Sequence, residues 1–284
     1  MDQPSVEFAL ADVGLSAVRF FSTIDSTNEE AKRWIEAGAR HLSLVVADEQ
    51  TAGRGRAGRR WVTPAGTGLA FSLVLLSPPI KPGSLSRLAG LGAVAVGQAL
   101  ESKYGLPAQV KWPNDVLLEG RKVGGVLVEA HWDGDALRSV IMGIGINIAP
   151  ESISASNLLT EGLSFPATCV ANVLGRSLDR SEFLRIILLE LLSWLPRLSG
   201  PEFILEWEAR LAYRNQWVEL SAGSNLAGAA DRPDVAEPLA GKLIGLAQDG
   251  SLQLSTSSGR LVTVAIGDLH LRPVMAGEPS LPKG

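Results

Sequence analysis

The sequence predicts an α+β fold, in which a mixed, mainly antiparallel sheet is flanked by helices and followed by a small β-barrel. Between residues 109 and 148, successive strand patterns are joined by short turns, which is typical of antiparallel pairing. Patterns with a helical period precede and follow this segment. Past Tyr213 only short strands and turns occur, so we expect two domains, residues 1–212 and 213–284.

The first expected elements follow about twenty loosely patterned residues. Ser26 and Glu29 have the spacing of a capping box, which predicts that a helix begins there. Residues 42–47 form a β-branched run, which we expect to be a buried strand, and residues 68–76 are expected to form the next strand. Residues 84–104 space their apolar side chains helically, which predicts a long helix.

The middle of the chain is expected to complete the sheet, and helices and the barrel follow it. The patterns predict strands at 109–112, 115–118, 122–132 and 137–148. They predict an irregular, Ser-rich segment at 151–166 and helices at about 167–176, 181–195 and 201–212. The barrel strands are expected at 217–220, 241–248, 251–256 and 261–266.

Composition and charge narrow the class of protein. With 284 residues, 46% of them hydrophobic and 20% charged, the chain can bury a large core, which excludes a disordered protein. The net charge of −4 argues against a broad basic face, so nucleic acid and anionic membranes are not expected as partners. Cys169 is the only cysteine, and the sequence shows no signal peptide pattern, so we expect a cytoplasmic protein.

One stretch departs from this mildly acidic average. Four arginines fall within positions 54–60, and no acidic residue occurs from position 50 to 100. The segment Gly53–Gly58 formally matches a dinucleotide-binding GxGxxG fingerprint, but no helix pattern follows it and the expected downstream acid is missing. Glycine N–H groups and guanidinium groups favour instead the binding of a phosphate or carboxylate. A solvated basic turn is the alternative.

Three further clusters are candidates for a site. The segment Lys111–Asp115 lies between two strand patterns, where a Pro turn can hold the Lys ammonium against a transferring phosphate. An ordinary β-turn is the alternative reading of that segment. Gly124–Gly125 and Gly143–Asn147 place glycines inside strands, which usually marks a bulge or the close approach of a ligand to the backbone.

Together these segments resemble the signatures of the biotin protein ligases. The matching segments, in order, are Asp25–Asn28, Gln50–Arg56, Lys111–Asp115, Gly125–Glu129 and Gly143–Asn147. The resemblance implies a ligase domain of the class II aminoacyl-tRNA synthetase type, and the C-terminal segment resembles the family's SH3-like domain. It also implies two steps: biotin's carboxylate attacks the α-phosphorus of ATP to give biotinyl-5′-AMP, and an acceptor lysine then attacks the mixed anhydride and releases AMP.

The resemblance also implies roles for single residues. Lys111 and Arg56 match the catalytic cations of the family. The residues that match its biotin contacts are Ser26, Thr27, Asn28, Gln50, Arg54, Gly55, Arg56, Lys111 and Gly125. Those that match its adenylate contacts are Arg54, Arg56, Trp61, Lys111 and Asn147. Taken singly, the polar residues read equally well as helix caps or strand ends, and Trp61 as a core residue.

The implied substrates are ATP and biotin, with Mg²⁺ held mainly by the substrate phosphates and no metal site in the protein. The implied partner is a biotin carboxyl carrier protein, and the sequence leaves open whether the chain forms a homodimer. Only 24 residues precede Asp25, so we expect a monofunctional ligase without a DNA-binding domain. The rival interpretations are a lipoate or octanoate protein ligase of related fold and a non-enzymatic binding module.

Overall fold

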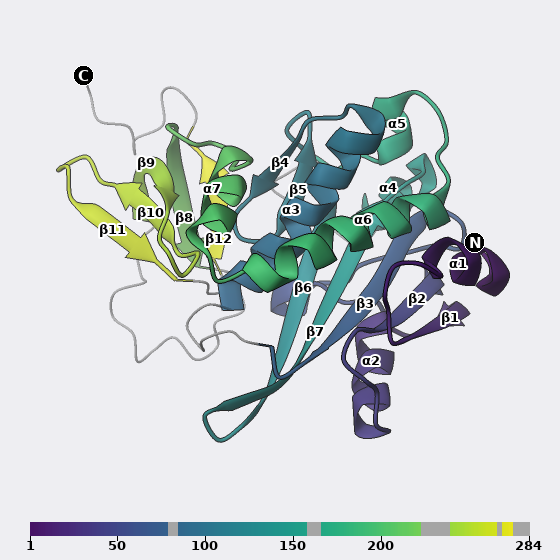
Figure 1. Ribbon diagram of the computed structural model, residues 1–284. Helices are drawn as coiled ribbons and strands as arrows, with labels where there is room; N and C mark the ends of the chain where they lie inside the picture. Colours follow the sequence, from purple (N-terminus) through teal and green to yellow (C-terminus); the bar gives the residue numbers. More distant parts are fainter. Residues whose placement is uncertain (79–84, 158–165, 223–238, 266–268, 275–284) are drawn as a thin grey trace.

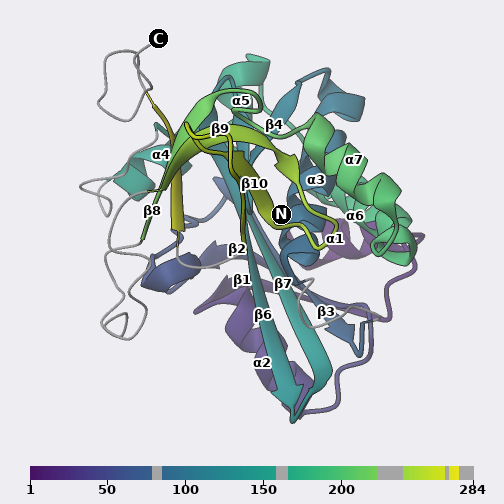
Figure 2. The same ribbon diagram turned by 90° about the vertical axis from the view of Figure 1, so that its left-hand side faces the viewer.

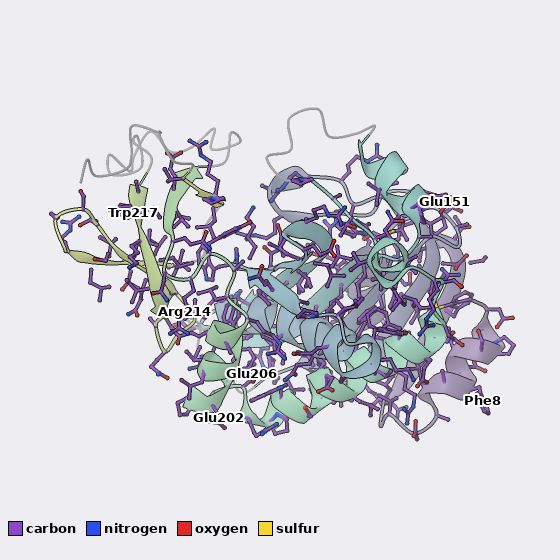
Figure 3. All side chains as sticks on the ribbon, turned by 90° about the horizontal axis from the view of Figure 1, so that it is seen from above. Phe8, Glu151, Glu202, Glu206, Arg214 and Trp217 are labelled. Carbon is purple, nitrogen blue, oxygen red and sulfur yellow. The ribbon has the colours of Figure 1, made fainter. Side chains whose placement is uncertain are left out.

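The computed structural model describes residues 1–78, 85–157, 166–222, 239–265 and 269–274. Figures 1 and 2 show a large sheet with helices packed against it and a smaller sheet beside it. Figure 3 places Trp217 on the smaller sheet and Phe8, which is 89% exposed, at the opposite end of the molecule. No helix in the described part of the chain combines the length and apolar character needed to cross a bilayer.

The larger sheet has seven strands within the described residues. They are β1 (Ala17–Ile24), β2 (Ser43–Gln50), β3 (Gly68–Leu76), β4 (Ala108–Lys111), β5 (Asp115–Leu118), β6 (Arg121–Asp133) and β7 (Ala136–Asn147). Their order is β1-β2-β3-β7-β6-β5-β4, and only β1 and β2 pair in parallel. The mixed, mainly antiparallel sheet is therefore confirmed, and the strands predicted in it lie within three residues of their expected ends.

The helices differ from expectation in two places. They are α1 (Gln3–Leu10), α2 (Thr27–Glu36), α3 (Leu85–Tyr104), α4 (Pro150–Asn157), α5 (Val170–Leu174), α6 (Arg180–Trp194), α7 (Pro201–Ala209) and the 3₁₀ turns η1 (Arg56–Gly58) and η3 (Leu195–Arg197). The first residues, expected to be loosely patterned, contain both α1 and β1. The Ser-rich segment expected to be irregular begins with α4, whereas residues 158–165 lie outside the described residues.

The predicted capping box is wrong, although the helix begins where it was expected. Ser26 is the N-cap residue of α2, but its side chain makes no capping hydrogen bond. The Ser26 N–H donates to Asp25 Oδ1 at 2.7 Å, and the Glu29 carboxylate pairs with Arg54 at 2.7 Å. The two groups that a capping box would join are therefore bonded to other partners.

The period-two alternation of the strands separates two faces of the large sheet. In β2, Leu44 and Val46 belong to the main core, whereas Val45 joins a second, smaller cluster that includes Ala31 of α2. The main core is covered by α3 and α6, and α2 covers the other face (Figure 1). We call this second side the α2 face.

The smaller sheet is antiparallel throughout the described residues. Its strands are β8 (Trp217–Ala222), β9 (Leu239–Leu246), β10 (Leu252–Ser255), β11 (Leu261–Val264) and β12 (Leu269–Pro273). They follow the order β11-β10-β9-β8-β12. The last of these strands, β12, was not predicted. Closure of this sheet into an SH3-like barrel and the domain boundary near residue 212 remain predictions.

Buried hydrogen bonds join the two sheets. Arg87 of α3 is only 4% exposed, and its Nε donates to the Gln248 carbonyl at 2.7 Å. Its Nη1 donates to the Gly200 carbonyl at 3.2 Å and also to that of Leu198. Beside it, Trp112 Nε1 donates to the Gly250 carbonyl at 3.0 Å. The turn between β9 and β10 is thereby fixed against α3 and the strand end that carries Lys111.

We expect Arg87→Leu to destabilise the whole chain, because it leaves several buried carbonyls without their charged donor. The free energy of unfolding should fall by about 2 to 4 kcal/mol, measured by urea denaturation. Arg138→Leu is the matched control, since Arg138 is exposed and its guanidinium pairs with the exposed carboxylate of Asp133. Equal stability of the two variants would contradict this account of Arg87.

Candidate active site

The α2 face of the sheet carries a row of small residues. The strand register aligns Ala47 with Ala70, Ala70 with Gly145, and Gly145 with Gly125 across β2, β3, β7 and β6. Large side chains are absent from this row, so the backbone itself forms the floor of a site. The same row continues through Asp115 of β5 to Lys111 of β4. The floor therefore runs from α2 to the predicted catalytic lysine.

Side chains from elsewhere lie directly on this floor. A methyl group at Gly143 would overlap the Asn28 amide, and one at Gly145 would overlap the Trp61 indole. Two of the predicted site residues therefore lie against the backbone at these glycines, and the close approach of a ligand there stays a prediction. Trp61 is half-buried over the sheet, so its interpretation as an ordinary core residue is wrong.

A network of neutral polar groups stands at the α2 end of the floor. Gln50 Oε1 accepts hydrogen bonds from the Thr27 backbone N–H at 2.9 Å and from Thr27 Oγ1 at 3.1 Å. Gln50 Nε2 donates to Thr63 Oγ1 at 3.2 Å. Ser72 Oγ contacts Thr27 Oγ1 at 2.8 Å and donates to Asn28 Oδ1 at 2.6 Å. Because all five residues are at most 9% exposed, these bonds hold their side chains in fixed orientations.

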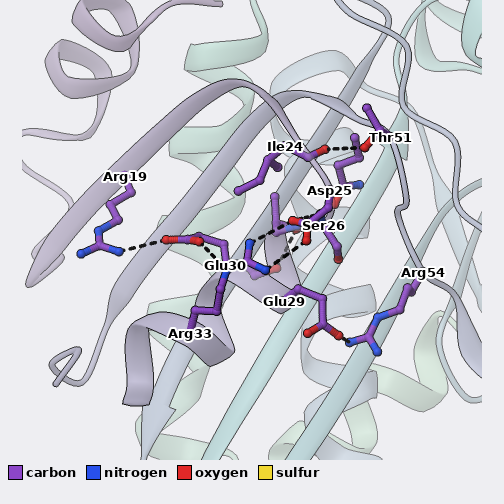
Figure 4. Close-up of polar contacts among 12 residues, drawn as sticks. Arg19, Ile24, Asp25, Ser26, Glu29, Glu30, Arg33, Thr51 and Arg54 are labelled. Atoms are coloured by element: carbon purple, nitrogen blue, oxygen red, sulfur yellow. Dashed lines mark hydrogen bonds and ion pairs between the residues drawn. The ribbon is translucent and has the colours of Figure 1, made fainter. Parts of the chain in front are cut away.

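Glu129 connects this network to the Gly/Arg loop, which we define as residues 51–62. Asn28 Nδ2 donates to Glu129 Oε2 at 2.6 Å. Arg54 Nη2 lies 2.8 Å from the same oxygen and 2.9 Å from Glu129 Oε1. Arg54 also pairs with Glu29 at 2.7 Å (Figure 4). Residues 50–100 contain no acidic residue, but in the fold two carboxylates from distant parts of the chain pair with Arg54 of this segment.

The Gly/Arg loop is a hairpin that leaves β2 and returns over the sheet. The Trp61 N–H donates to the Gly53 carbonyl at 2.9 Å, and the Gly55 N–H donates to the Arg59 carbonyl at 2.7 Å. Its tip is the short 3₁₀ turn Arg56–Gly58, in which Ala57 has a left-handed φ of 57°. No α-helix begins here among the described residues, which agrees with the rejection of a dinucleotide-binding fingerprint.

A cluster of charged groups stands at the other end of the floor. Lys122 Nζ pairs with Asp115 Oδ1 at 2.6 Å and lies 5.7 Å from the centre of the Trp61 ring. Burial, against the opposing charge of Asp115 and with the positive charges of Lys122 and Arg59, lowers the pKa of Lys111 to about 8. Burial raises the pKa of Asp115, but the nearby cations outweigh it and hold that pKa below its usual value.

Asn114 joins the loop to this charged cluster. Its Nδ2 donates to the Val126 carbonyl at 2.6 Å, and its Oδ1 accepts from Arg56 Nη1 at 3.1 Å. The segment between β4 and β5 is therefore tied both to β6 and to the tip of the loop. The cis peptide bond Trp112–Pro113 lies in the same segment. Lys111–Asp115 is thus a built part of the site as well as a turn.

The structure brings together most of the residues that the sequence singled out. Ser26 is 2% exposed at the start of α2, beside Thr27. Gly55 lies in the loop, and a methyl group at Gly125 would approach Asp115 and Lys122 to 3.4 Å. Asn147 stands apart, because its Nδ2 donates to the Thr168 carbonyl at 3.2 Å. Its adenylate contact remains a prediction.

Three residues of this site were missed by the sequence reasoning: Ser72, Lys122 and Glu129. Ser72 is a polar residue inside a buried apolar strand, which is a signal that it bonds to something. Lys122 and Glu129 flank the Gly124–Gly125 pair on β6, within or beside a segment already singled out. Alternation along β6 places Glu129 on the same face as Gly125, whereas Lys122 is an odd number of residues away and reaches Asp115 where the pairing of β5 with β6 shifts register. The partners of both residues come from other strands and cannot be read from a linear pattern.

The chain is similar to known proteins along most of its length. Residues 20–147 match the model of the biotin/lipoate A/B protein ligase family. The biotin–[acetyl-CoA-carboxylase] ligase of Mycobacterium tuberculosis is 32% identical over 260 residues, which cover 87% of this chain and 86% of that protein. The solved biotin protein ligase of Aquifex aeolicus, in complex with biotin and ATP, matches with a TM-score of 0.73 and 30% identity. This match covers 92% of the present chain and 100% of the Aquifex chain.

A further relative is longer than the matched part. The bifunctional ligase/repressor BirA of Bacillus spizizenii is 40% identical over 166 residues, or 58% of this chain. These residues cover 50% of the Bacillus protein, so the match spans about half the length of that relative.

We expect the Lys111 ammonium to titrate near pH 8, because its burial disfavours the charged form. The measurement is the pH dependence of the lysine ¹³Cε resonance, assigned by its loss in Lys111→Met. Asp115→Asn should lower the pKa further, because Asp115 is the charge that raises it. A Lys111 resonance that titrates above pH 10 would contradict the buried position described here.

Proposed function

The chain belongs to the biotin/lipoate A/B protein ligase family and, within it, to the biotin protein ligases, and on that basis we propose that it attaches biotin to a lysine of an acceptor protein using ATP. One observation carries the proposal: a neutral polar network and a pair of lysines lie at opposite ends of one side-chain-poor floor. A small molecule with a polar head and an anionic tail fits that arrangement.

Biotin's ureido head would bind at the α2 end. A neutral ureido group needs both donors and acceptors in a largely apolar pocket, and Ser26, Thr27, Asn28 and Gln50 supply them. Ser72 and Glu129 hold the Asn28 amide from two sides, so that it is oriented before a ligand arrives. Gly125 and the other small residues of the floor leave room for the rest of the molecule.

The carboxylate would lie toward the lysine pair. In the first step its oxygen attacks the α-phosphorus of ATP, the bond to the bridging oxygen breaks, and biotinyl-5′-AMP and pyrophosphate form. Negative charge on the phosphoryl oxygens then needs fixed cations, for which Lys111, Lys122 and Arg56 are placed. Bound anions favour the charged form of Lys111 and so oppose the effect of its burial.

In the second step the acceptor lysine's amine attacks the carbonyl carbon of the anhydride, and AMP leaves. Exclusion of water protects the anhydride until the acceptor arrives, which is the role we give to the Gly/Arg loop with Gly55 and to Trp61. The nucleotide would be the Mg²⁺ complex of ATP, with the ion held mainly by the phosphates, and Asn147 would lie on the nucleotide side. Among the described residues, no three His, Cys, Asp or Glu side chains gather to hold a metal.

Three finer points belong to the same proposal. Residues 1–212 would be the catalytic domain, of the class II aminoacyl-tRNA synthetase type, and residues 213–284 an SH3-like domain. The antiparallel five-stranded sheet of the C-terminal segment supports the second assignment. The acceptor would be a biotin carboxyl carrier protein, because two of the similar ligases are named for acetyl-CoA carboxylase.

Incubation of the protein with biotin, MgATP and a carrier domain should label the carrier. Lys111→Ala should reduce biotinyl-AMP formation by at least about 100-fold, because a cation placed for the phosphoryl oxygens is lost. The readouts are carrier mass and pyrophosphate release, and circular dichroism checks that the variant is folded. Label from lipoate alone would overturn the proposal, and full activity of Lys111→Ala would remove Lys111 from the mechanism.

We expect Arg56→Gly to let biotinyl-AMP escape, because the guanidinium that ties the loop to Asn114 is removed. Released adenylate should then biotinylate bystander proteins, which a streptavidin blot of added serum albumin would detect. Arg60→Gly is the matched control, since it makes the same substitution in the same loop at a side chain that bonds the Thr51 carbonyl. Equal bystander labelling by the two variants would mean that Arg56 does not guard the intermediate.

A further inference from the structure

Glu129 occupies an unusual place between two parts of the site. One of its carboxylate oxygens receives both the Asn28 amide, at 2.6 Å, and the Arg54 guanidinium, at 2.8 Å. Asn28 of α2 belongs to the neutral polar network described above, and Arg54 belongs to the Gly/Arg loop. A single carboxylate on β6 therefore touches the ligand-facing amide and the loop that lies over the site.

The charges around Arg54 are not matched one to one. Glu29 of α2 and Glu129 of β6 both contact its Nη2 nitrogen, at 2.7 and 2.8 Å. Two carboxylates thus neutralise one guanidinium, whereas Arg56 reaches the other end of the floor and contacts Asn114. Arg54 therefore contacts two carboxylates and Arg56 contacts an amide, so we assign different roles to the two arginines.

We propose that Glu129 is a positioning residue that fixes the Gly/Arg loop through Arg54 and orients the Asn28 amide for the ligand, with Glu29 as a second anchor of the loop only. This inference rests on the proposed function for the ligand's identity. Arg54 is then a loop anchor, and Arg56 is the arginine that meets the adenylate. The anchor on β6 sets where the loop crosses the sheet.

The ion pairs that anchor Arg54 are weak, which allows the Gly/Arg loop to open. Arg54, Glu29 and Glu129 are 41, 33 and 35% exposed, so water and salt screen their attraction. The Asn28 bond lies deeper, because Asn28 itself is 4% exposed. Loss of charge at Glu129 should therefore loosen the loop modestly, while loss of the whole side chain should also disturb the amide.

Four variants separate these effects. Glu129→Gln keeps an oxygen near the Asn28 amide but removes the charge, and Glu129→Ala removes both. Glu29→Gln removes only the second loop contact. Glu30→Gln is the control, because Glu30 is the next residue of the same helix and pairs with Arg19 and Arg33 away from the loop (Figure 4).

The first measurement needs no ligand: hydrogen exchange of the Gly55 and Trp61 amides, which are bonded across the loop. Exchange should quicken about 2- to 5-fold in Glu29→Gln and in both Glu129 variants, and stay at the wild-type rate in Glu30→Gln. The second measurement is the biotin dissociation constant by calorimetry. It should rise about tenfold in Glu129→Ala and stay unchanged in Glu29→Gln.

Wild-type loop exchange in Glu129→Gln and Glu129→Ala would overturn the inference, whatever their biotin affinity. Unchanged biotin affinity in Glu129→Ala would overturn the role in orienting Asn28. Quickened loop exchange in a protein that binds no biotin would support the anchor and overturn the proposed function instead. The two failures are therefore distinguishable.

Discussion

The site depends on one steric constraint: the near absence of side chains along the row Ala47, Ala70, Gly145 and Gly125. Four adjacent strands contribute to this row. A larger side chain at any of its positions would occupy the space above the sheet in which the other groups of the site lie. Gly145 in this row lets the indole of Trp61 approach the backbone itself, and Gly143, two residues earlier on β7, does the same for Asn28 of α2. The polar network, the loop and the lysine pair are all arranged around that low floor.

Charge is distributed along this floor rather than concentrated in the loop. The part of the loop nearest α2 is neutralised by carboxylates from α2 and β6. The far end combines Lys111, Lys122 and Arg59 around Asp115, and Arg56 contacts the neighbouring Asn114. An ordinary count along the chain assigns the positive charge to residues 54–60. In three dimensions the effective cationic centre moves to the end of β4 and the start of β6, because pairing depends on distance and not on sequence separation.

Local patterns were enough to predict most strands and the long helices, because burial of alternating or helically spaced side chains dominates there. They failed where the decisive partner is distant. Glu29 is the clearest case: its spacing from Ser26 predicts a cap, but Arg54 takes its carboxylate. Short elements such as α1 and β12 were also missed, since a few residues carry little periodic signal. The motif residues were recognised from the sequence alone, whereas the partners of Lys122 and Ser72 follow only from the arrangement of strands and helices in the fold.

The hydrogen bonds between the β9–β10 turn and α3 bear on how such chains can be recombined. Gly250 has a φ of +85°, and a methyl group there would meet Ser86 and Trp207, while its carbonyl receives Trp112. A hybrid protein that took the smaller sheet from another protein would need a glycine at the same position of the β9–β10 turn, so that the turn could still pack against α3. The two sheets are therefore poor interchangeable modules: exchange between lineages would be tolerated only for donor sequences that already carry this turn.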